Sequence, residues 1–291
     1  GAALDAGRAV QLIAASTVTL SNGQFTVIPQ AGDAGELTVD GVVSAANAQL
    51  AAANNNLGAL AINTSGVVRA TGTEWNPDGS ISIVAQGRGG NVGASGALTA
   101  HNADGSGGTI GVRGTNVSVT GARVDASGTQ GGTVSIAADT AQGTALVTDS
   151  RIGASGDSAA GGLIGITGWH TGLVGQTTVD ASGASAGGTV LVGGGMHGQD
   201  SRIANATATT IGSDVVLRAN GTQGDASGGE VVAWSNDTTR FAGTIGATGS
   251  GAGHGGDAEV SGAGTLDYRG FANLAGKLDE GQLVGQQPPA G

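Results

Sequence analysis

The chain has 291 residues, including 59 glycines, 4 prolines and no cysteine, and its net charge at neutral pH is −11. Collagen needs abundant proline and disorder needs low hydrophobicity with high charge, so 38% hydrophobic and 11% charged residues exclude both. The basic residues do not cluster, which argues against nucleic acid and anionic membrane surfaces as partners, and no stretch is apolar enough for membrane insertion. A repeat array with many turns and a small-residue aliphatic core remains.

Residues 1–66 are expected to form irregular N-terminal coils. Strand-like segments at 18–20 and 25–27 flank Asn22-Gly23, a pair that favours a β-hairpin. The alanine-rich segment 44–53 fits either one or two helical turns or further coils, and we favour coils.

Residues 67–270 are expected to form regular repeats. An apolar step followed by Ala-Ser-Gly occurs at 124–128, 152–156 and 179–183, and looser copies occur elsewhere. The anchoring alanines recur about every 28 residues, with a longer interval between the fifth and sixth: Ala70, Ala100, Ala126, Ala154, Ala181, Ala219 and Ala247.

A Gly-Gly pair follows most of these anchors and starts an alternating segment. The residues two and four positions after the pair are apolar in every copy: Ile110 and Val112, Val134 and Ile136, Ile164 and Ile166, Val190 and Val192, Val231 and Ala233, Ala258 and Val260. This alternation predicts short strands with one buried face. Glycine is expected at the corners because the chain needs unusual dihedral angles there.

A period near 28 residues accommodates three short strands and three turns, which is one coil of a solenoid. Several glycines per unit exclude helical repeats, since each costs about 1 kcal/mol in a helix. Aligned apolar columns require parallel stacking at about 4.8 Å. The predicted fold is all-β: a right-handed parallel β-helix of about ten coils, on the order of 50 Å long.

Two further segments depart from the repeat. The long interval places extra residues at 193–208, which predicts a protruding loop. Residues 271–291 are expected to be a coil remnant and a linker containing Pro288-Pro289. Neither end offers an evident cap, which predicts head-to-tail self-association or capping by neighbouring parts of a longer chain.

The second half of the chain resembles filamentous haemagglutinin-like exoproteins of two-partner secretion systems in Gram-negative bacteria. The resemblance covers about residues 120–270, and its most specific parts are Val-Val-Ala-Trp-Ser at 231–235, Thr-Arg-Phe-Ala-Gly at 239–243 and Gly-Gly-Asp-Ala-Glu-Val-Ser-Gly at 255–262. It implies a long right-handed parallel β-helix that leaves the cell through an outer-membrane transporter. It also implies a secreted protein at the bacterial cell surface that serves attachment, aggregation or biofilm formation.

One short motif bears on which part of such a protein this is. Asn76-Pro77-Asp78-Gly79 is similar to an Asn-Pro-Asn-Gly type motif in the secretion domain of the family. Because it lies within a repeat, we interpret it as a turn. The segment is therefore expected to belong to the stalk, downstream of the secretion domain.

Candidate sites are sparse. The best set for catalysis is Asp125, Asp180 and Arg218, which Gly153 interrupts and no aromatic residue accompanies, so we expect no enzyme. Gly255-Gly256-Asp257 is a single, weak match to the repeated Gly-Gly-x-Gly-x-Asp nonapeptide that binds calcium, and it is expected to be a turn. The four histidines, His101, His170, His197 and His254, lie in different coils, so neither a metal nor a cofactor is expected.

One contact patch is a candidate. Leu191 and Val232 occupy outward positions in neighbouring coils, and Trp234 and His197 lie nearby. Either these side chains form an exposed patch beside the loop at 193–208, or the loop folds over and covers them.

The sequence thus predicts a rigid, adhesive stalk with an outer-membrane transporter as its export partner and an unidentified host or matrix ligand, for which polysaccharide is one candidate. Two alternatives stay open. One is a carbohydrate-binding or carbohydrate-cleaving β-helix, and the other is a self-assembling extracellular fibre subunit.

Overall fold

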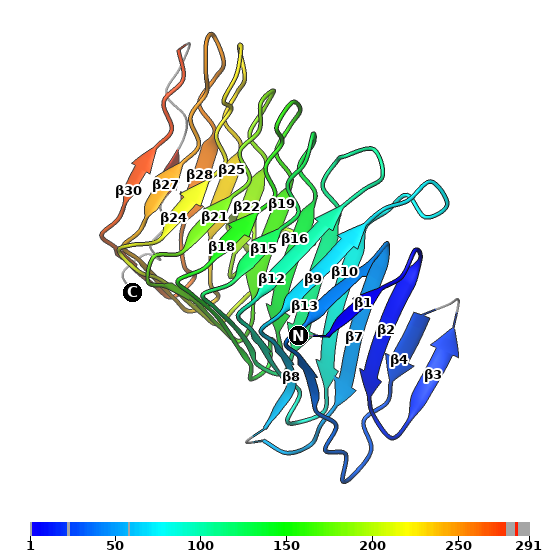
Figure 1. Ribbon diagram of the computed structural model, residues 1–291. Helices are drawn as coiled ribbons and strands as arrows, with labels where there is room; N and C mark the ends of the chain where they lie inside the picture. The colour runs from blue at the N-terminus through cyan, green and yellow to red at the C-terminus, as the bar shows by residue number, and fades with distance from the viewer. Residues whose placement is uncertain (1, 22–23, 58, 278–282, 285–291) are drawn as a thin grey trace.

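The computed structural model describes residues 2–21, 24–57, 59–277 and 283–284 and shows a β-solenoid built of three parallel sheets (Figure 1). Each coil of the chain contributes one strand to each sheet in turn. Sheet 1 contains β1 (Ala3–Asp5), β6 (Val42–Ala45), β9 (Val67–Thr71), β12 (Ala97–His101), β15 (Arg123–Asp125), β18 (Arg151–Gly153), β21 (Thr178–Asp180), β24 (Val216–Arg218), β27 (Thr244–Gly246) and β30 (Phe271–Asn273).

The other two sheets complete each coil. Sheet 2 contains β2 (Ala9–Ala14), β7 (Asn47–Ala53), β10 (Ser80–Gln86), β13 (Thr109–Gly114), β16 (Thr133–Ala138), β19 (Leu163–Thr167), β22 (Thr189–Val192), β25 (Glu230–Ala233), β28 (Asp257–Val260) and β31 (Leu283–Val284). Sheet 3 contains β5 (Leu37–Val39), β8 (Leu60–Thr64), β11 (Asn91–Ala94), β14 (Val117–Thr120), β17 (Thr144–Thr148), β20 (His170–Val174), β23 (Ala208–Ile211), β26 (Thr238–Phe241) and β29 (Thr265–Tyr268).

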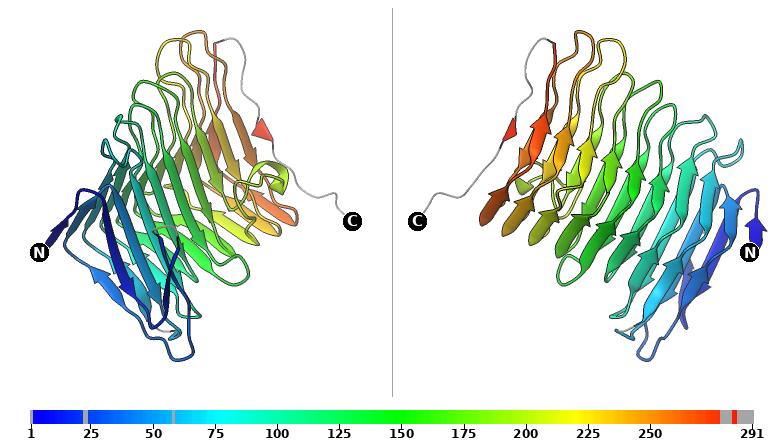
Figure 2. Two further views of the ribbon diagram at one scale, coloured as in Figure 1. Left: turned by 90° about the vertical axis from the view of Figure 1, so that its right-hand side faces the viewer. Right: turned by 60° about the vertical axis from the view of Figure 1, so that its left-hand side comes forward.

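The predicted parallel solenoid is therefore confirmed, with a smaller number of regular coils. The coils run without interruption from β6 to β29, which gives about eight turns rather than ten. The two views in Figure 2 show these coils stacked side by side along one axis.

The core is made of aliphatic columns, as the alternation predicted. All twelve residues two and four positions after the Gly-Gly pairs are at most 1% exposed, and all seven anchoring alanines are fully buried. The register aligns them directly: Ile136 on β16 pairs with Val112 on β13 and with Ile166 on β19. Each coil thus buries its apolar face against identical positions of the next coil.

The reason for the Gly-Gly pairs differs from the expectation. Single turn glycines such as Gly105, Gly121 and Gly175 have a positive φ, as expected, but no member of these six pairs does, so unusual dihedral angles do not explain the pairs. Instead, the second glycine of each pair lies against the backbone of the preceding coil: a Cβ at Gly108, Gly132, Gly162, Gly188, Gly229 or Gly256 would lie 2.0–2.3 Å from a glycine carbonyl oxygen of that coil. Glycine is required because the corners of successive coils approach too closely for any side chain.

The N-terminal part is more regular than expected. The alanine-rich segment forms β6 and β7, which pair in parallel with the strands that follow, so the helical alternative was wrong. The main irregularity is the insertion between β2 and β5, where β3 (Val18–Ser21) and β4 (Gln24–Val27) pair antiparallel as the predicted hairpin. Its turn, Asn22-Gly23, lies outside the described residues.

The motif at 76–79 lies next to a turn instead of forming one: the turn is at Glu74-Trp75, and only Asn76 of the motif takes part in closing it. Thr73 and Asn76 exchange two backbone hydrogen bonds, and the Pro77 carbonyl accepts the N–H of Ala103 from the next coil. At the other end, β30 and β31 continue sheets 1 and 2, and the rest of the segment expected to be a coil remnant and linker, residues 278–282 and 285–291, lies outside the described residues. The single helical element of the described ranges is a 3-10 turn, η1 (Met196–Gly198), and those ranges contain no helix of the length and apolarity that a bilayer crossing requires.

Candidate functional site: a groove on sheet 2

Two segments outside the coils cover the outer face of sheet 2 near its two ends. The first is the hairpin β3–β4, whose Val27 packs against Ala51 and Ala53 of β7. The Gln49 side chain fixes the hairpin, because it accepts the N–H of Phe25 at 3.3 Å and donates to the carbonyl of the same residue.

The second cover is the loop at 193–207, which joins β22 to β23 and contains η1. It folds over the sheet instead of protruding (Figure 2). Leu191, Val232 and Trp234 are 1%, 0% and 9% exposed, and Met196 and Ile203 of the loop pack on them. The proposed exposed contact patch is therefore wrong. The second alternative holds instead: the loop folds over the apolar outward side chains and covers them.

A buried carboxylate holds the apex of this loop. Glu259 occupies the outward position next to Val232 and is fully buried. Its Oε2 accepts the backbone N–H of His197 at 2.7 Å, and its Oε1 accepts the hydroxyl of Ser261 and lies 3.5 Å from His197 Nδ1. His197 has a φ of 53°, a conformation that non-glycine residues rarely adopt and that this hydrogen bond helps to fix.

Glu259→Ala should release the loop. The backbone N–H of His197 and the Ser261 hydroxyl lose a charged acceptor, which costs about 2 kcal/mol. Trypsin should then cleave after the exposed Arg202 faster than in the unmodified chain. Asp257→Ala is the matched control, because Asp257 is the other acidic residue of β28 and is exposed. Equal cleavage rates in both variants would show that Glu259 does not hold the loop.

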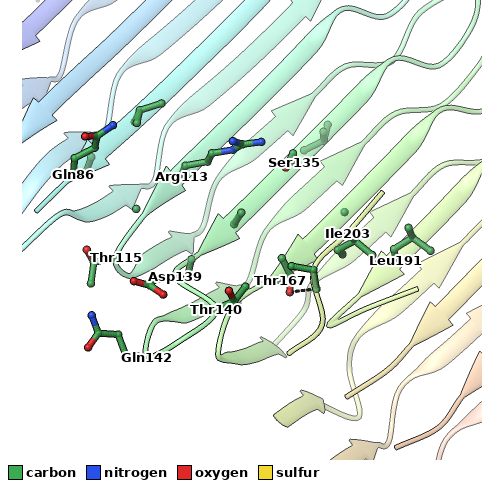
Figure 3. Close-up of a pocket in the computed structure, with 18 of the residues that line it drawn as sticks. Gln86, Arg113, Thr115, Ser135, Asp139, Thr140, Gln142, Thr167, Leu191 and Ile203 are labelled. Carbon is green, nitrogen blue, oxygen red and sulfur yellow. Dashed lines mark hydrogen bonds between the residues drawn. The ribbon is translucent and has the colours of Figure 1, made fainter. Parts of the chain in front are cut away.

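A groove lies on sheet 2 between the two covers. It has a volume of about 980 Å³ and runs from Pro29, beyond the hairpin, to Ile203 and Ala204 of the loop. Small outward residues form its floor, Ser135 and Gly165 among them, and one wall is the turn at 139–142 (Figure 3). The loop wall is fixed by Thr167, whose hydroxyl donates to the Ala204 carbonyl at 2.7 Å.

The outward column on sheet 2 explains why the groove lies where it does. From β2 to β28 the aligned residues are Gln11, Gln49, Ser82, Gly111, Ser135, Gly165, Leu191, Val232 and Glu259. The larger members of this column lie at the two covered ends, and the small ones lie between them. The size of the residue at this outward position therefore distinguishes the covered stretches of the sheet from the open one.

Two cations of the groove lack partners. Neither the Arg88 nor the Arg113 guanidinium forms an ion pair or hydrogen bond with any residue in the described ranges. Arg202 differs, since it contacts Asp200 and, at 3.3 Å, Glu230. Asp139 also lines the groove, and its Oδ1 accepts the N–H of Ala141 at 2.8 Å.

The acidic set considered for catalysis lies elsewhere, on the outer face of sheet 1. Arg218 and Asp180 are paired in register with a 4.0 Å contact, while Asp125 is bound by Arg123. Burial raises the pKa of Asp125, but hydrogen bonds from Ser127 and Arg123 outweigh it, so the pKa lies below its usual value. Asp125 is thus held as a carboxylate in a salt bridge, which is a structural role.

The residues considered as metal ligands do not converge. Within the described ranges no three histidine, aspartate or glutamate side chains gather as a metal site requires. The groove and its cations gave no sequence signal of their own, because Arg88 follows the end of β10, Arg113 lies within β13, and neither belongs to a motif. Their juxtaposition depends on the register of β10 and β13.

Among solved structures, the fold is similar to the crystal structure of the HMW1 secretion domain from Haemophilus influenzae. The TM-score is 0.67 at 21% sequence identity, and the match covers 94% of this chain and 77% of that one. No protein-family model matches the sequence, and no curated protein matches it. At this identity the similarity concerns the fold, so the conclusion is that this chain shares the parallel β-solenoid of a bacterial secretion domain.

Proposed function

We propose that the chain is a rigid segment of a secreted bacterial surface protein, exported with the help of an outer-membrane transporter, and that it serves attachment without catalysing a reaction. The observation that carries this proposal is the fold: an uninterrupted parallel solenoid with the architecture of a secretion domain from Haemophilus influenzae. The sequence resemblance to two-partner secretion exoproteins supports the same role. A solenoid suits it because each coil is held by its neighbours and the stack is stiff along its axis.

Both covers of sheet 2 are compatible with this role. The hairpin and the loop cover apolar outward residues, so the described surface of sheet 2 carries no large apolar patch at those places. Asp125, Asp180 and Arg218 are paired with each other or with neighbours, which supports a role without catalysis. Asp125→Asn or Arg218→Gln should accordingly leave attachment unchanged.

Display of the full chain on a non-adherent Gram-negative host tests the adhesive role. We expect displaying cells to attach to extracellular-matrix or polysaccharide-coated surfaces in greater numbers than cells displaying Ile136→Asp, a variant whose core is disrupted. Attachment no greater than with that variant would contradict the adhesive role and leave a spacer only.

Head-to-tail assembly into a fibre stays a second proposal. Phe271 is 63% exposed and Tyr268 is 38% exposed in the last coils described, and Leu4 in the first is 47% exposed. Such apolar surface at opposite ends favours an open-ended contact between copies. Light scattering that shows species growing with concentration is the expected result, and a constant monomeric mass would contradict it.

A further inference from the structure

We propose that the groove on sheet 2 binds an acidic polysaccharide, with Arg88 and Arg113 receiving its carboxylates. This inference rests on the adhesive role proposed above and names the ligand class for it. It starts from the two unpartnered guanidinium groups, since a protein of net charge −11 places both on the same groove and pairs neither with an acid in the described ranges.

The local register explains why Arg113 is available. On β13 it lies between Val84 of β10 and Ala137 of β16, so no acidic side chain faces it across either neighbouring strand. Arg88 follows the end of β10, where its backbone N–H is held by Asn55 at 3.0 Å while its side chain is exposed. A planar guanidinium binds a carboxylate through two parallel hydrogen bonds, which a sugar acid offers and a neutral sugar does not.

The rest of the lining suits sugar hydroxyls. Ser135 and Thr140 present hydroxyl groups, and Gln86 and Gln142 present amides (Figure 3). Thr133 adds a further hydroxyl to the lining, and all of these groups both donate and accept hydrogen bonds. Gly165 keeps the floor low beside the loop, where a Cβ would lie 3.6 Å from Ile203 Cδ1. The lining crosses five strands, β10 to β22, which at about 4.8 Å per strand spans about 19 Å.

Two other polymers fit this surface less well. The floor is the face of a sheet whose strands are hydrogen-bonded on both sides, so an extended peptide finds no free edge to join. No aromatic side chain lines the groove within the described ranges, so nucleobases have no surface on which to stack. A linear chain of carboxylate-bearing sugars needs neither.

Isothermal titration of the full chain with oligogalacturonate tests the inference, with a maltooligosaccharide of equal length as the neutral probe. We expect binding of the acidic probe only, and weaker binding at higher salt because the guanidinium–carboxylate pairs are exposed. Arg113→Ala and Arg88→Ala should each weaken binding about tenfold, since each removes a charge-assisted pair. Arg240→Ala is the matched control, because Arg240 is exposed on sheet 3, away from the groove, and its loss should change nothing.

Three results would overturn the inference. The first is that oligogalacturonate does not bind, and the second is that the neutral probe or polyglutamate binds equally well. The third is that Arg240→Ala weakens binding as much as Arg88→Ala or Arg113→Ala does. The groove and the adhesive role can be tested separately. If cells displaying the Arg88→Ala and Arg113→Ala double variant attach as well as cells displaying the unmodified chain, the ligand site in the groove is refuted but the adhesive role is not. A chain that binds oligogalacturonate but gives no attachment refutes the adhesive role instead.

Discussion

Ile136→Asp is expected to destabilise the solenoid by more than about 4 kcal/mol, because it buries an unpaired carboxylate between aliphatic layers. Ile136 is fully buried between Val112 and Ile166 of the adjacent coils. Circular dichroism during thermal unfolding should show loss of the folded state or a large fall in Tm.

Ser135→Asp is the control, one residue away on the same strand. Ser135 faces the groove between Gly111 and Gly165, where there is room and solvent for a carboxylate. We expect a change within about 0.5 kcal/mol, as for an ordinary surface substitution. Similar losses of stability in the two variants would contradict the register of sheet 2. Ser135→Asp should also weaken oligogalacturonate binding, because it places a negative charge on the groove floor.

Gly162→Ala is expected to cost about 3 kcal/mol through overpacking. The added Cβ would lie 2.0 Å from the carbonyl oxygen of Gly132 and 2.7 Å from the carbonyl carbon of Gly131, and both atoms belong to the backbone of the preceding coil. Neither can move without breaking the hydrogen bonds of the corner. Differential scanning calorimetry should therefore report a lower Tm for this single added methyl group.

Gly111→Ala separates this steric cost from a general cost of replacing glycine. Gly111 lies in the middle of β13, where the added methyl group meets open space, and alanine reduces the freedom of the unfolded chain. Its stability should equal or exceed that of the unmodified chain. A loss as large as that of Gly162→Ala would contradict close backbone approach as the reason for the Gly-Gly corners.

The repeat explains why the core was predictable from sequence and the groove was not. Inward positions such as Ile110 and Val134 obey the same rule in every coil, so the alternation after each Gly-Gly pair assigns them from local sequence. The coil-by-coil spacing of the anchoring alanines then brings these positions into register. Both signals are local and repeated, and the structure confirms both.

The site depends on segments that occur once. The loop at 193–207 is held by apolar contacts and by Glu259, which is 62 residues from its partner His197 and is one of many dispersed acidic residues in the sequence. Similarly, Arg88 and Arg113 meet in one groove only because β10 and β13 stack in a particular register. In the outward column of sheet 2, large residues occur where a segment covers the sheet. This pattern is present in the sequence, but it can be interpreted only once the hairpin and the loop are known to lie over the sheet.

The positions of the core columns and of the groove all depend on parallel stacking in register, and spin-label distances test that claim most directly. The chain has no cysteine, so two introduced thiols are labelled uniquely. Asn63 on β8 is the fixed site, and Thr210, Arg240 and Asp267 follow it along the same outward column of sheet 3. Because stacked strands are about 4.8 Å apart, the three pairs should give about 24, 29 and 34 Å, an increase of one strand spacing per coil. Distances that do not increase by this constant step would contradict the solenoid and the groove built on it.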